Sequence, residues 1–488
     1  MGTENKNNLV NTSAQPLLPS RAQPNYLTIA QKIEKNIADG KLIAGQKLGS
    51  IRQLAKSEAV SINTIRAALD SLVQSNRISS VPRIGFVVNQ CDHNNSNDLY
   101  EHFIPDSRLA ETSQRWLKAM VLGQRSSIAF FHMAVPTDTK IFKSFQRQYR
   151  QVINQSIHRE NDSAKGLNSL RQIISEHLAQ RQCNINSSDI QITNGCQHAI
   201  EHALRTLCKP GDTIAIPVPA FPGYFALLGV LGLKAVEVPM SPQGPDPEIL
   251  QQVMADKNVK ALLIQPNCHN PTGITLSDEY KQQIAGWANQ YHMPIIEDDI
   301  TAQLSFSGQA ASLIANYDSQ GWCLIVSSIS KIIGDSERIG WCCPGRFKTQ
   351  YMTQFAVSQI SNSYFLQQTL ARYYQGSLYQ SQLRQWRLEV KIATTAIALY
   401  LQNALTDSIS MTPSTGGYSL WIKLPPQLSA QQLHQQIDKS KIDFLSGELF
   451  SLEMRFKQFI RLIIMPALNE KTYAGIDHLI SVIKKHTD

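Results

Sequence analysis

Apolar residues recur at helical spacing three times in the first part of the chain. Ile29, Ile33 and Ile37 form the first such series. The three series together predict short helices over residues 26–38, 51–57 and 62–75. Ser50 and Ser61 precede the second and third helices, where a serine side chain can cap free backbone N–H groups. The pattern therefore predicts a small helical domain near the N-terminus.

Two extended segments, at 77–80 and 85–88, follow the third helix and predict a β-ribbon, or wing, with Arg83 near its tip. Asn63, Thr64 and Arg66 face outward near the start of the third helix, opposite its apolar side. A recognition helix meets base edges and phosphates at this position. The pattern favours DNA binding, although a domain used only for docking to another protein would show the same helices.

From about residue 128 the pattern changes to strands that alternate with helices. This predicts an α/β domain built on a largely parallel sheet. Polar residues follow several of the predicted strands, and ligands of open α/β sheets bind at the carboxyl ends of the strands. The candidate residues at these ends are Asn194, Gly195 and Cys196, Phe221, Asn270, Asp298, and Ser328, Ser330 and Lys331.

Lys331 has the most specific chemistry of this group. It lies on a small-residue turn just past the buried run Cys323–Val326. Burial lowers a lysine pKa and makes the amine a nucleophile toward an aldehyde. Ser328, Ser330 and Arg338 can hold a dianionic phosphate beside it. An imine-forming lysine next to a phosphate site is what pyridoxal 5'-phosphate (PLP) requires, but a surface lysine in a serine-rich loop would have the same local sequence.

Other strand ends supply the context for this interpretation. Gly195 allows the backbone to approach a ligand, and the helix that follows favours an anion at its N-terminus. Phe221 or Tyr224 can stack on a flat ring, and Asn270 can donate a hydrogen bond to a phenolate oxygen. The carboxylate of Asp298 can keep a pyridinium nitrogen protonated.

Composition narrows the class of protein further. The chain has 488 residues, 42% of them hydrophobic, and a formal charge of +8, which permits nucleic-acid binding without requiring it. Its eight cysteines show no zinc-site spacing, so we expect reduced thiols and no metal. No apolar run suggests an export signal or a membrane span, and we expect a cytoplasmic protein. Residues 1–24 are expected to be a disordered tail and 91–124 a linker, with an amphipathic helix over 109–122.

The first domain resembles the GntR family of winged helix-turn-helix regulators over roughly residues 26–88. The shared motifs include Ser50-x-Arg52-x-Leu54-Ala55, Val60-Ser61-x-x-Thr64-Ile65 and the wing Gly85-Phe86-Val87. The resemblance implies DNA contacts from the helix and wing residues Ser50, Arg52, Ser61, Asn63, Thr64, Arg66, Arg83 and Gly85. Two departures, Gly49 for a proline and Ile62 for an arginine, imply weaker or altered DNA binding.

The second domain, residues 125–488, resembles the fold-type I PLP enzymes of aminotransferase class I/II. His269-Asn270-Pro271-Thr272-Gly273 and Ser328-x-Ser330-Lys331 carry most of the resemblance. It implies that Lys331 is the Schiff-base lysine and that Asn270 and Asp298 contact the ring hydroxyl and ring nitrogen. Phe221 stacks on the ring, Asn194, Gly195, Cys196, Ser328, Ser330 and Arg338 take the phosphate, and Arg461 grips the carboxylate of an amino acid.

The departures from this second pattern concern the residues that tune the chemistry. No tyrosine stands at Ile300 or Thr301, Asn161 replaces a tyrosine that reaches the partner subunit's phosphate, and Ala134 replaces a glycine near the substrate. The resemblance therefore implies cofactor binding with inefficient transamination.

A GntR-type domain over residues 25–90, joined by a linker to an aminotransferase-like domain with a smaller C-terminal α/β subdomain, resembles the MocR subfamily of bacterial regulators. The expected function is a PLP-dependent transcriptional regulator that senses an amino acid, an amine or PLP itself. Its expected partners are an operator on double-stranded DNA and a second copy of the chain. The alternatives are an active aminotransferase with an accessory DNA-binding head, and a PLP-free remnant that only binds DNA.

Overall fold

The computed structural model describes residues 25–38, 41–42, 45–74, 78–81, 85–88, 114–117, 135–155 and 164–487. The chain divides into two compact units, residues 1–103 and 104–488. Several predictions lie outside the described residues: the N-terminal tail, most of the linker, the wing tip with Arg83, and the departures at Ala134 and Asn161.

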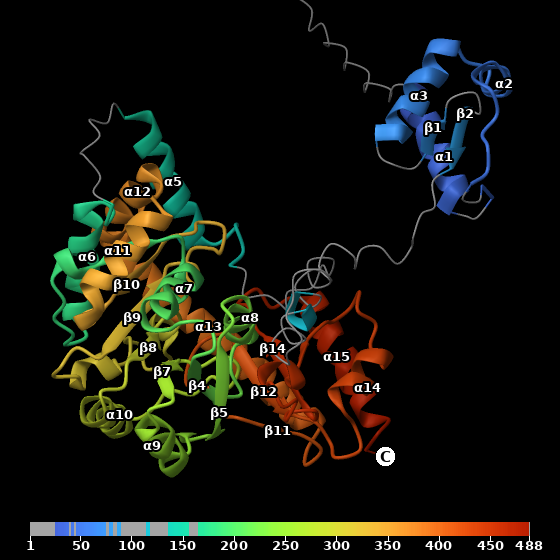
Figure 1. Ribbon diagram of the computed structural model, residues 1–488. Coiled ribbons are helices and arrows are strands. Elements are labelled where there is room, and N and C mark those ends of the chain that lie inside the picture. The colour runs from blue at the N-terminus through green and yellow to red at the C-terminus, as the bar shows by residue number, and fades with distance from the viewer. Residues whose placement is uncertain are drawn as a thin grey trace, which may run out of the picture. The chain divides into compact units, whose positions relative to one another are not determined.

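The first unit contains the three predicted helices and the predicted ribbon (Figure 1). Its elements are α1 (Asn25–Ala38), α2 (Ile51–Ser57), α3 (Ile62–Gln74), β1 (Ile78–Val81) and β2 (Gly85–Val88). Ile65, Leu69 and Leu72 of α3 are buried against α1, as their spacing of three to four residues requires. β1 and β2 pair antiparallel, with Ile78 opposite Val88, so this unit is a winged helix-turn-helix.

The second unit is built on an eight-stranded sheet in the order β3-β10-β9-β8-β7-β4-β5-β6. The strands are β3 (Gln191–Thr193), β4 (Thr213–Val218), β5 (Lys234–Ser241), β6 (Gly244–Pro245), β7 (Val259–Ile264), β8 (Ile295–Asp298), β9 (Cys323–Ser328) and β10 (Gly340–Cys343). β5, β4, β7, β8 and β9 run parallel, while β10 is antiparallel to both of its neighbours. The predicted α/β domain with a largely parallel sheet is confirmed.

Helices cover both faces of this sheet (Figure 1). Ile214 and Ile216 pack on the side of α7 and α8, whereas Ala215 between them packs on the side of α9 and α10. This alternation follows from the two-residue period of a strand. The helices are α5 (Lys140–Asn154), α6 (Asn168–Ala179), α7 (Cys196–Leu207), α8 (Pro222–Val230), α9 (Pro247–Ala255), α10 (Asp278–Tyr291), α11 (Lys348–Ser358) and α12 (Tyr364–Gln375).

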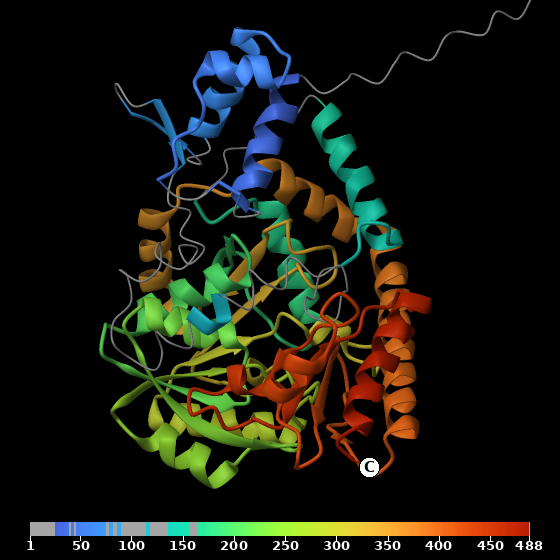
Figure 2. The same cartoon turned by 90° about the vertical axis from the view of Figure 1, so that its right-hand side faces the viewer.

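A smaller C-terminal subdomain follows the long helix α13 (Ser377–Ala404). It has a four-stranded antiparallel sheet in the order β11-β12-β14-β13, which packs with α13, α14 and α15 (Figure 2). Its elements are β11 (Ser410–Met411), β12 (Ser419–Lys423), α14 (Ala430–Gln436), β13 (Leu445–Ser446), β14 (Phe459–Ile463) and α15 (Glu470–Lys484). No helix among the described residues is long and apolar enough to cross a membrane.

Candidate functional site

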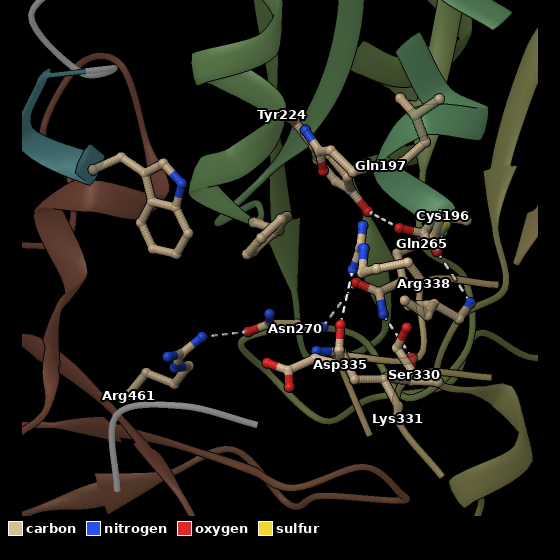
Figure 3. A pocket seen from close by; sticks show the side chains of 16 residues that line it. Cys196, Gln197, Tyr224, Gln265, Asn270, Ser330, Lys331, Asp335, Arg338 and Arg461 are labelled. Atoms are coloured by element: carbon tan, nitrogen blue, oxygen red, sulfur yellow. Dashed lines mark hydrogen bonds between the residues drawn. The ribbon is translucent and has the colours of Figure 1, made fainter. Parts of the chain in front are cut away.

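A cavity of about 190 Å³ lies where the carboxyl ends of β7, β8 and β9 meet the N-terminal end of α7 (Figure 3). The parallel strands bring together segments that are far apart in sequence, as the strand-end rule predicts. The predicted site residues that line the cavity are Cys196, Phe221, Asn270, Asp298, Ser330, Lys331, Arg338 and Arg461.

Lys331 contributes a primary amine to this cavity. It follows β9 by three residues, on a turn in which Ser330 N–H donates to Ser328 Oγ at 3.1 Å. Burial lowers the pKa of the Lys331 amine, and the cations of Arg461 and Arg338 act in the same direction, against the carboxylate of Asp335. Its Nζ makes no hydrogen bond or ion pair with the part of the chain that the structure describes. An amine in this state is available to attack a carbonyl carbon.

Asp298, at the end of β8, is held by three donors. Tyr224 Oη donates to its Oδ2 at 2.5 Å, Ile300 N–H to its Oδ1 at 3.0 Å, and Cys196 Sγ to Oδ1 at 3.4 Å. Burial raises the pKa of Asp298, and these three hydrogen bonds oppose that rise. The carboxylate is thus fixed at the cavity wall, where it can accept a hydrogen bond from a protonated ring nitrogen.

Asn270 and Arg461 are hydrogen-bonded neighbours in the cavity lining (Figure 3). Arg461 Nη1 donates to Asn270 Oδ1 at 3.3 Å, which turns the Asn270 side-chain amide toward its role as a donor. The Arg461 guanidinium lies over the Phe450 ring, 5.5 Å from its centroid. Burial lowers the pKa of Arg461 to about 9, so it remains charged at neutral pH and can bind a carboxylate.

The turn before α7, where a phosphate site was predicted, lies against Arg338. Gly195 has φ +88°, and a Cβ there would lie 2.6 Å from Arg338 Nη2. Arg338 donates to Asn194 O at 3.2 Å, so a glycine is needed for the guanidinium to reach the turn. This close approach places a cation beside a helix N-terminus, which fits a phosphate group.

Three predicted phosphate residues do not line the cavity: Asn194, Gly195 and Ser328. The Asn194 side chain donates to Gln359 Oε1 at 3.1 Å. Ser328 Oγ donates to Ile339 O at 2.8 Å and lies 2.8 Å from Ser330 Oγ. In this arrangement Ser328 shapes the lysine turn, and Ser330 reaches the cavity.

Ile300 and Thr301 occupy the positions where the resembled family has a tyrosine, and they make other contacts. Thr301 Oγ1 donates to Asn267 O at 3.0 Å and accepts from Gln265 Nε2 at 2.6 Å. Gln265 Oε1 in turn accepts from Asn270 N–H at 3.1 Å. Ile300 lines the cavity with an apolar side chain. These residues support the turn at Asn270 and add no phenol to the site.

The two acidic neighbours of Asp298 are structural. Asp299 forms a bidentate ion pair with Arg181, and both side chains are almost fully buried, at 4% and 7% exposure. Glu297 accepts from the backbone N–H groups of Ile314 and Ala315 at 2.8 and 3.1 Å. Burial, with the charge of Asp299, raises the pKa of Glu297 to about 7.

Several cavity residues were not predicted as site residues: Trp116, Gln197, Ile200, Gln265 and Asp335. Gln197 and Ile200 lie one and four residues beyond Cys196 on α7, so helical spacing could have indicated them. Trp116 comes from the segment 114–117, within the helix predicted over 109–122. Nothing in the sequence connects that segment to a strand end.

Some of the candidate DNA-binding residues of the first unit cap helices or shape the ribbon, and the others are exposed side chains. Ser50 caps α2 in a reciprocal pair with Gln53, and Ser61 Oγ accepts from Thr64 N–H at 3.1 Å, so these hydroxyls serve the helix ends. Gly85 begins β2 with φ +106°. Arg52, Asn63 and Arg66 are exposed, and so is Ile62, at 46%. The backbone of Lys47 forms an isolated antiparallel β-bridge with Val87 of the ribbon.

Comparison with known proteins matches each of the two units to a protein family. Residues 137–482 match the family described as aminotransferase class I and II, and residues 25–88 match the gntR family of bacterial regulatory proteins. The chain is 28% identical to a protein named uncharacterized HTH-type transcriptional regulator YjiR of Escherichia coli, over 90% of this chain and 94% of the relative. It is 24% identical to uncharacterized HTH-type transcriptional regulator YdfD of Bacillus subtilis, over 95% and 97% of the two chains.

Solved structures of similar fold are aminotransferases. A kynurenine aminotransferase of Pyrococcus horikoshii has a TM-score of 0.69 at 22% identity, over 77% of this chain and 95% of that one. An archaeal alanine:glyoxylate aminotransferase gives 0.69 at 20% identity, over 81% and 99%. The fold is thus that of PLP-dependent aminotransferases. The chain belongs to the aminotransferase class I and II family and, with its gntR-type DNA-binding head, to the MocR type of regulator.

Proposed function

We propose that this protein is a DNA-binding transcriptional regulator whose aminotransferase-like domain holds PLP and senses an amino acid or amine. The observation that carries the proposal is the pairing of two sites in one chain. One unit exposes Arg52, Asn63 and Arg66 around a recognition helix, and the other places Lys331 in a cavity with Asp298.

The cavity residues fit PLP. The glycine turn beside Arg338 suits its phosphate, Asp298 its ring nitrogen and Asn270 its ring hydroxyl, while Phe221 offers a flat face. When bound, PLP supplies an aldehyde carbon that a primary amine attacks and a ring that accepts electrons. Lys331 provides the resident amine, and its lowered pKa lets it exchange with the amine of an incoming ligand.

The site supports ligand exchange better than turnover. Arg461 binds a carboxylate, and Asp298 holds a proton at the ring nitrogen, but Ile300 and Thr301 place no phenol beside the ring. We therefore expect multiple-turnover transamination to stay below roughly 1 per second, the lower end of typical enzyme rates. A rate well above that value with any common amino acid and 2-oxoglutarate would favour the aminotransferase alternative.

Regulation also requires that ligand binding reach the DNA. We propose a dimer formed through the large domain, so that two DNA-binding heads read two half-sites of an operator. Ligand exchange at Lys331 would then shift the arrangement of the two heads and so change the affinity for the operator. Sedimentation at micromolar concentration should give twice the chain mass. A monomer would contradict the dimer and leave the cofactor assignment standing.

The test compares Lys331→Ala with Lys260→Ala, which removes an exposed lysine that does not line the cavity, near the amino end of β7. The parent and Lys260→Ala should show a PLP absorbance that borohydride removes, and their DNA affinity should change when an amino acid effector is added. Lys331→Ala should lose the borohydride-sensitive absorbance and the response, while it keeps basal DNA binding. An unchanged absorbance in Lys331→Ala would show that another lysine carries PLP.

A further inference from the structure

Helix α5 of the large domain carries a row of positive charges on its exposed side. Its cationic residues recur at intervals of three and four positions: Lys140, Lys143, Arg147 and Arg150. With about 3.6 residues per turn, these positions fall within about 80° of the helix circumference, over about 15 Å of its length. All four side chains are exposed, and α5 contains no Asp or Glu. We call this row the α5 basic stripe.

The opposite side of α5 is buried in the large domain. Ile141, Phe145 and Val152 are 2%, 3% and 0% exposed. α5 packs on α12 (Figure 1), where the Phe145 ring meets the Tyr373 ring edge-on with 5.9 Å between centroids. A helix that binds a membrane surface must insert a free apolar side among the lipids. The apolar side of α5 is already used by the core, so the stripe suits a partner that offers charge alone.

No acidic side chain of the described residues neutralises the α5 basic stripe. None of its four cations forms an ion pair there, and Arg150 Nη2 donates to the neutral Gln146 Oε1 at 3.3 Å. The chain has no Asp or Glu over residues 338–388, which include α12 and the first part of α13, and both of these helices pack on α5. That part of α13 instead adds the exposed cation of Arg384. The surface around the stripe therefore has a positive potential.

The α5 basic stripe works against the stability of its own helix. Lys143 and Arg147 are four positions apart, and Arg147 and Arg150 are three apart, spacings at which like charges repel each other. Lys140 lies in the first turn, where the positive end of the helix dipole disfavours a cation. These charges do not serve the fold, and a polyanion bound along the stripe would remove their repulsion.

Double-stranded DNA is the polyanion that the rest of the chain favours as a partner. The first unit matches a family of bacterial regulatory proteins with a DNA-binding head, and the chain has a formal charge of +8. A length of about 15 Å of B-DNA carries roughly nine phosphate charges, so several cations of the stripe can each meet one. Lysine and arginine contacts to phosphates supply affinity without reading the bases.

We infer that the α5 basic stripe is a second DNA-binding surface, which contacts the phosphate backbone independently of sequence. The inference rests on the DNA binding of the first unit and adds a direct contact from the aminotransferase-like domain. The domain that holds the cofactor therefore contributes to DNA affinity itself, in addition to the recognition helix.

The experiment measures the affinity of full-length, PLP-loaded protein for a fluorescent duplex of mixed sequence by anisotropy. The duplex has about 60 base pairs, and potassium chloride is varied from about 50 to 300 mM. Lys143→Gln/Arg147→Gln/Arg150→Gln replaces three cations of the stripe by a neutral residue that also favours a helix. The slope of log affinity against log salt should become shallower by about two to three, and the affinity at about 150 mM salt should fall about tenfold or more.

The matched control is Lys471→Gln/Lys484→Gln/Lys485→Gln, which removes three exposed lysines in and just after α15 and changes the net charge equally. It should keep the salt slope of the parent and an affinity within about twofold. Both variants should show the gel-filtration volume and PLP absorbance of the parent, because all six side chains are exposed.

Two results would overturn the inference. One is an α5 variant with the salt slope and affinity of the parent. The other is a control variant that weakens binding as much as the α5 variant, since net charge alone would then explain the effect. Loss of binding to phosphatidylserine vesicles with unchanged DNA binding would assign the stripe to anionic lipid instead.

Arg52→Ala/Arg66→Ala separates this inference from the function of the first unit. If that variant binds the duplex like the parent while the α5 variant does not, the stripe stands and DNA binding by the recognition helix fails. If the head variant loses affinity and the α5 variant does not, the first unit stands and the stripe fails. A parent that binds no duplex would remove both.

Discussion

The adjacent acids Asp298 and Asp299 should give opposite results when each is changed to asparagine. Asp299→Asn breaks the bidentate pair with Arg181, whose partners are 4% and 7% exposed. Removing one member of a buried ion pair leaves the other charge uncompensated and costs about 3–5 kcal/mol. Arg181 retains hydrogen bonds from its Nε and Nη2 to Ala311 O at 2.9 and 2.6 Å, so we expect about 3 kcal/mol, the lower end of that range.

Asp298→Asn should leave stability within about 1 kcal/mol of the parent, because a neutral amide avoids the cost of burying a charge. The raised pKa of Asp298, caused by burial, has the same origin. The loss of the Asp298 carboxylate should instead weaken cofactor retention, since an amide does not hold a protonated ring nitrogen.

The assay is urea unfolding of cofactor-free protein followed by tryptophan fluorescence, because a bound ligand would itself shift stability. The transition of the large domain is compared among variants, as a chain of two units does not unfold in a single step. PLP retention after gel filtration is measured separately. The reasoning is refuted if Asp299→Asn unfolds at the parent urea concentration, or if it loses PLP while Asp298→Asn keeps it.

Three further predictions concern Tyr224, Arg66 and two buried histidines. Tyr224→Phe removes the 2.5 Å hydrogen bond that opposes the rise of the Asp298 pKa, so any pH transition of the cofactor absorbance that reports Asp298 should move to higher pH; an unmoved transition would contradict this. Arg66→Ala should relax sequence preference at particular base pairs by roughly 1–3 kcal/mol, measured by titrating operator and scrambled DNA, whereas equal weakening on both would indicate a phosphate contact. Burial lowers the pKa of His202 to about 4 and that of His269 to about 3. The unfolded chain therefore binds more protons below pH ~6.5, and the melting temperature should fall from there toward pH 4. His269→Gln should make the melting temperature fall less steeply with decreasing pH. A variant with the same pH profile as the parent would refute the lowered pKa of His269 as a cause of the fall.

The local sequence determined most of the secondary structure. The spacing of Ile65, Leu69 and Leu72 indicated the buried face of α3, and Ser50 and Ser61 indicated where two helices begin. The run before Lys331 indicated β9, and polar residues after apolar runs indicated the strand ends that form the cavity. These features depend on periodicity and capping, which operate within a few residues.

The roles of neighbouring polar residues were decided by the tertiary structure. Ser328 and Ser330 are two residues apart, yet the bond from Ser328 to Ile339 O leaves Ser330 at the cavity. Asp299 turns to Arg181, more than a hundred residues away, whereas Asp298 meets Tyr224. Asp298 ends β8 and Asp299 follows it, so contacts with distant elements, rather than strand alternation alone, decide which acid lines the cavity.

The pairing of Trp116 with Phe221 in the cavity lining came only from the tertiary structure. Trp116 precedes the large sheet by about seventy-five residues, and the ring it meets, Phe221, lies after β4. No local pattern joins the two, because the contact depends on how the chain passes the subdomain cluster of Trp421 and Phe450. The sequence alone therefore predicted a lysine and an arginine for the site. The packing of distant residues decided which aromatic rings line the cavity beside them, because hydrophobic contact depends on proximity in space rather than along the chain.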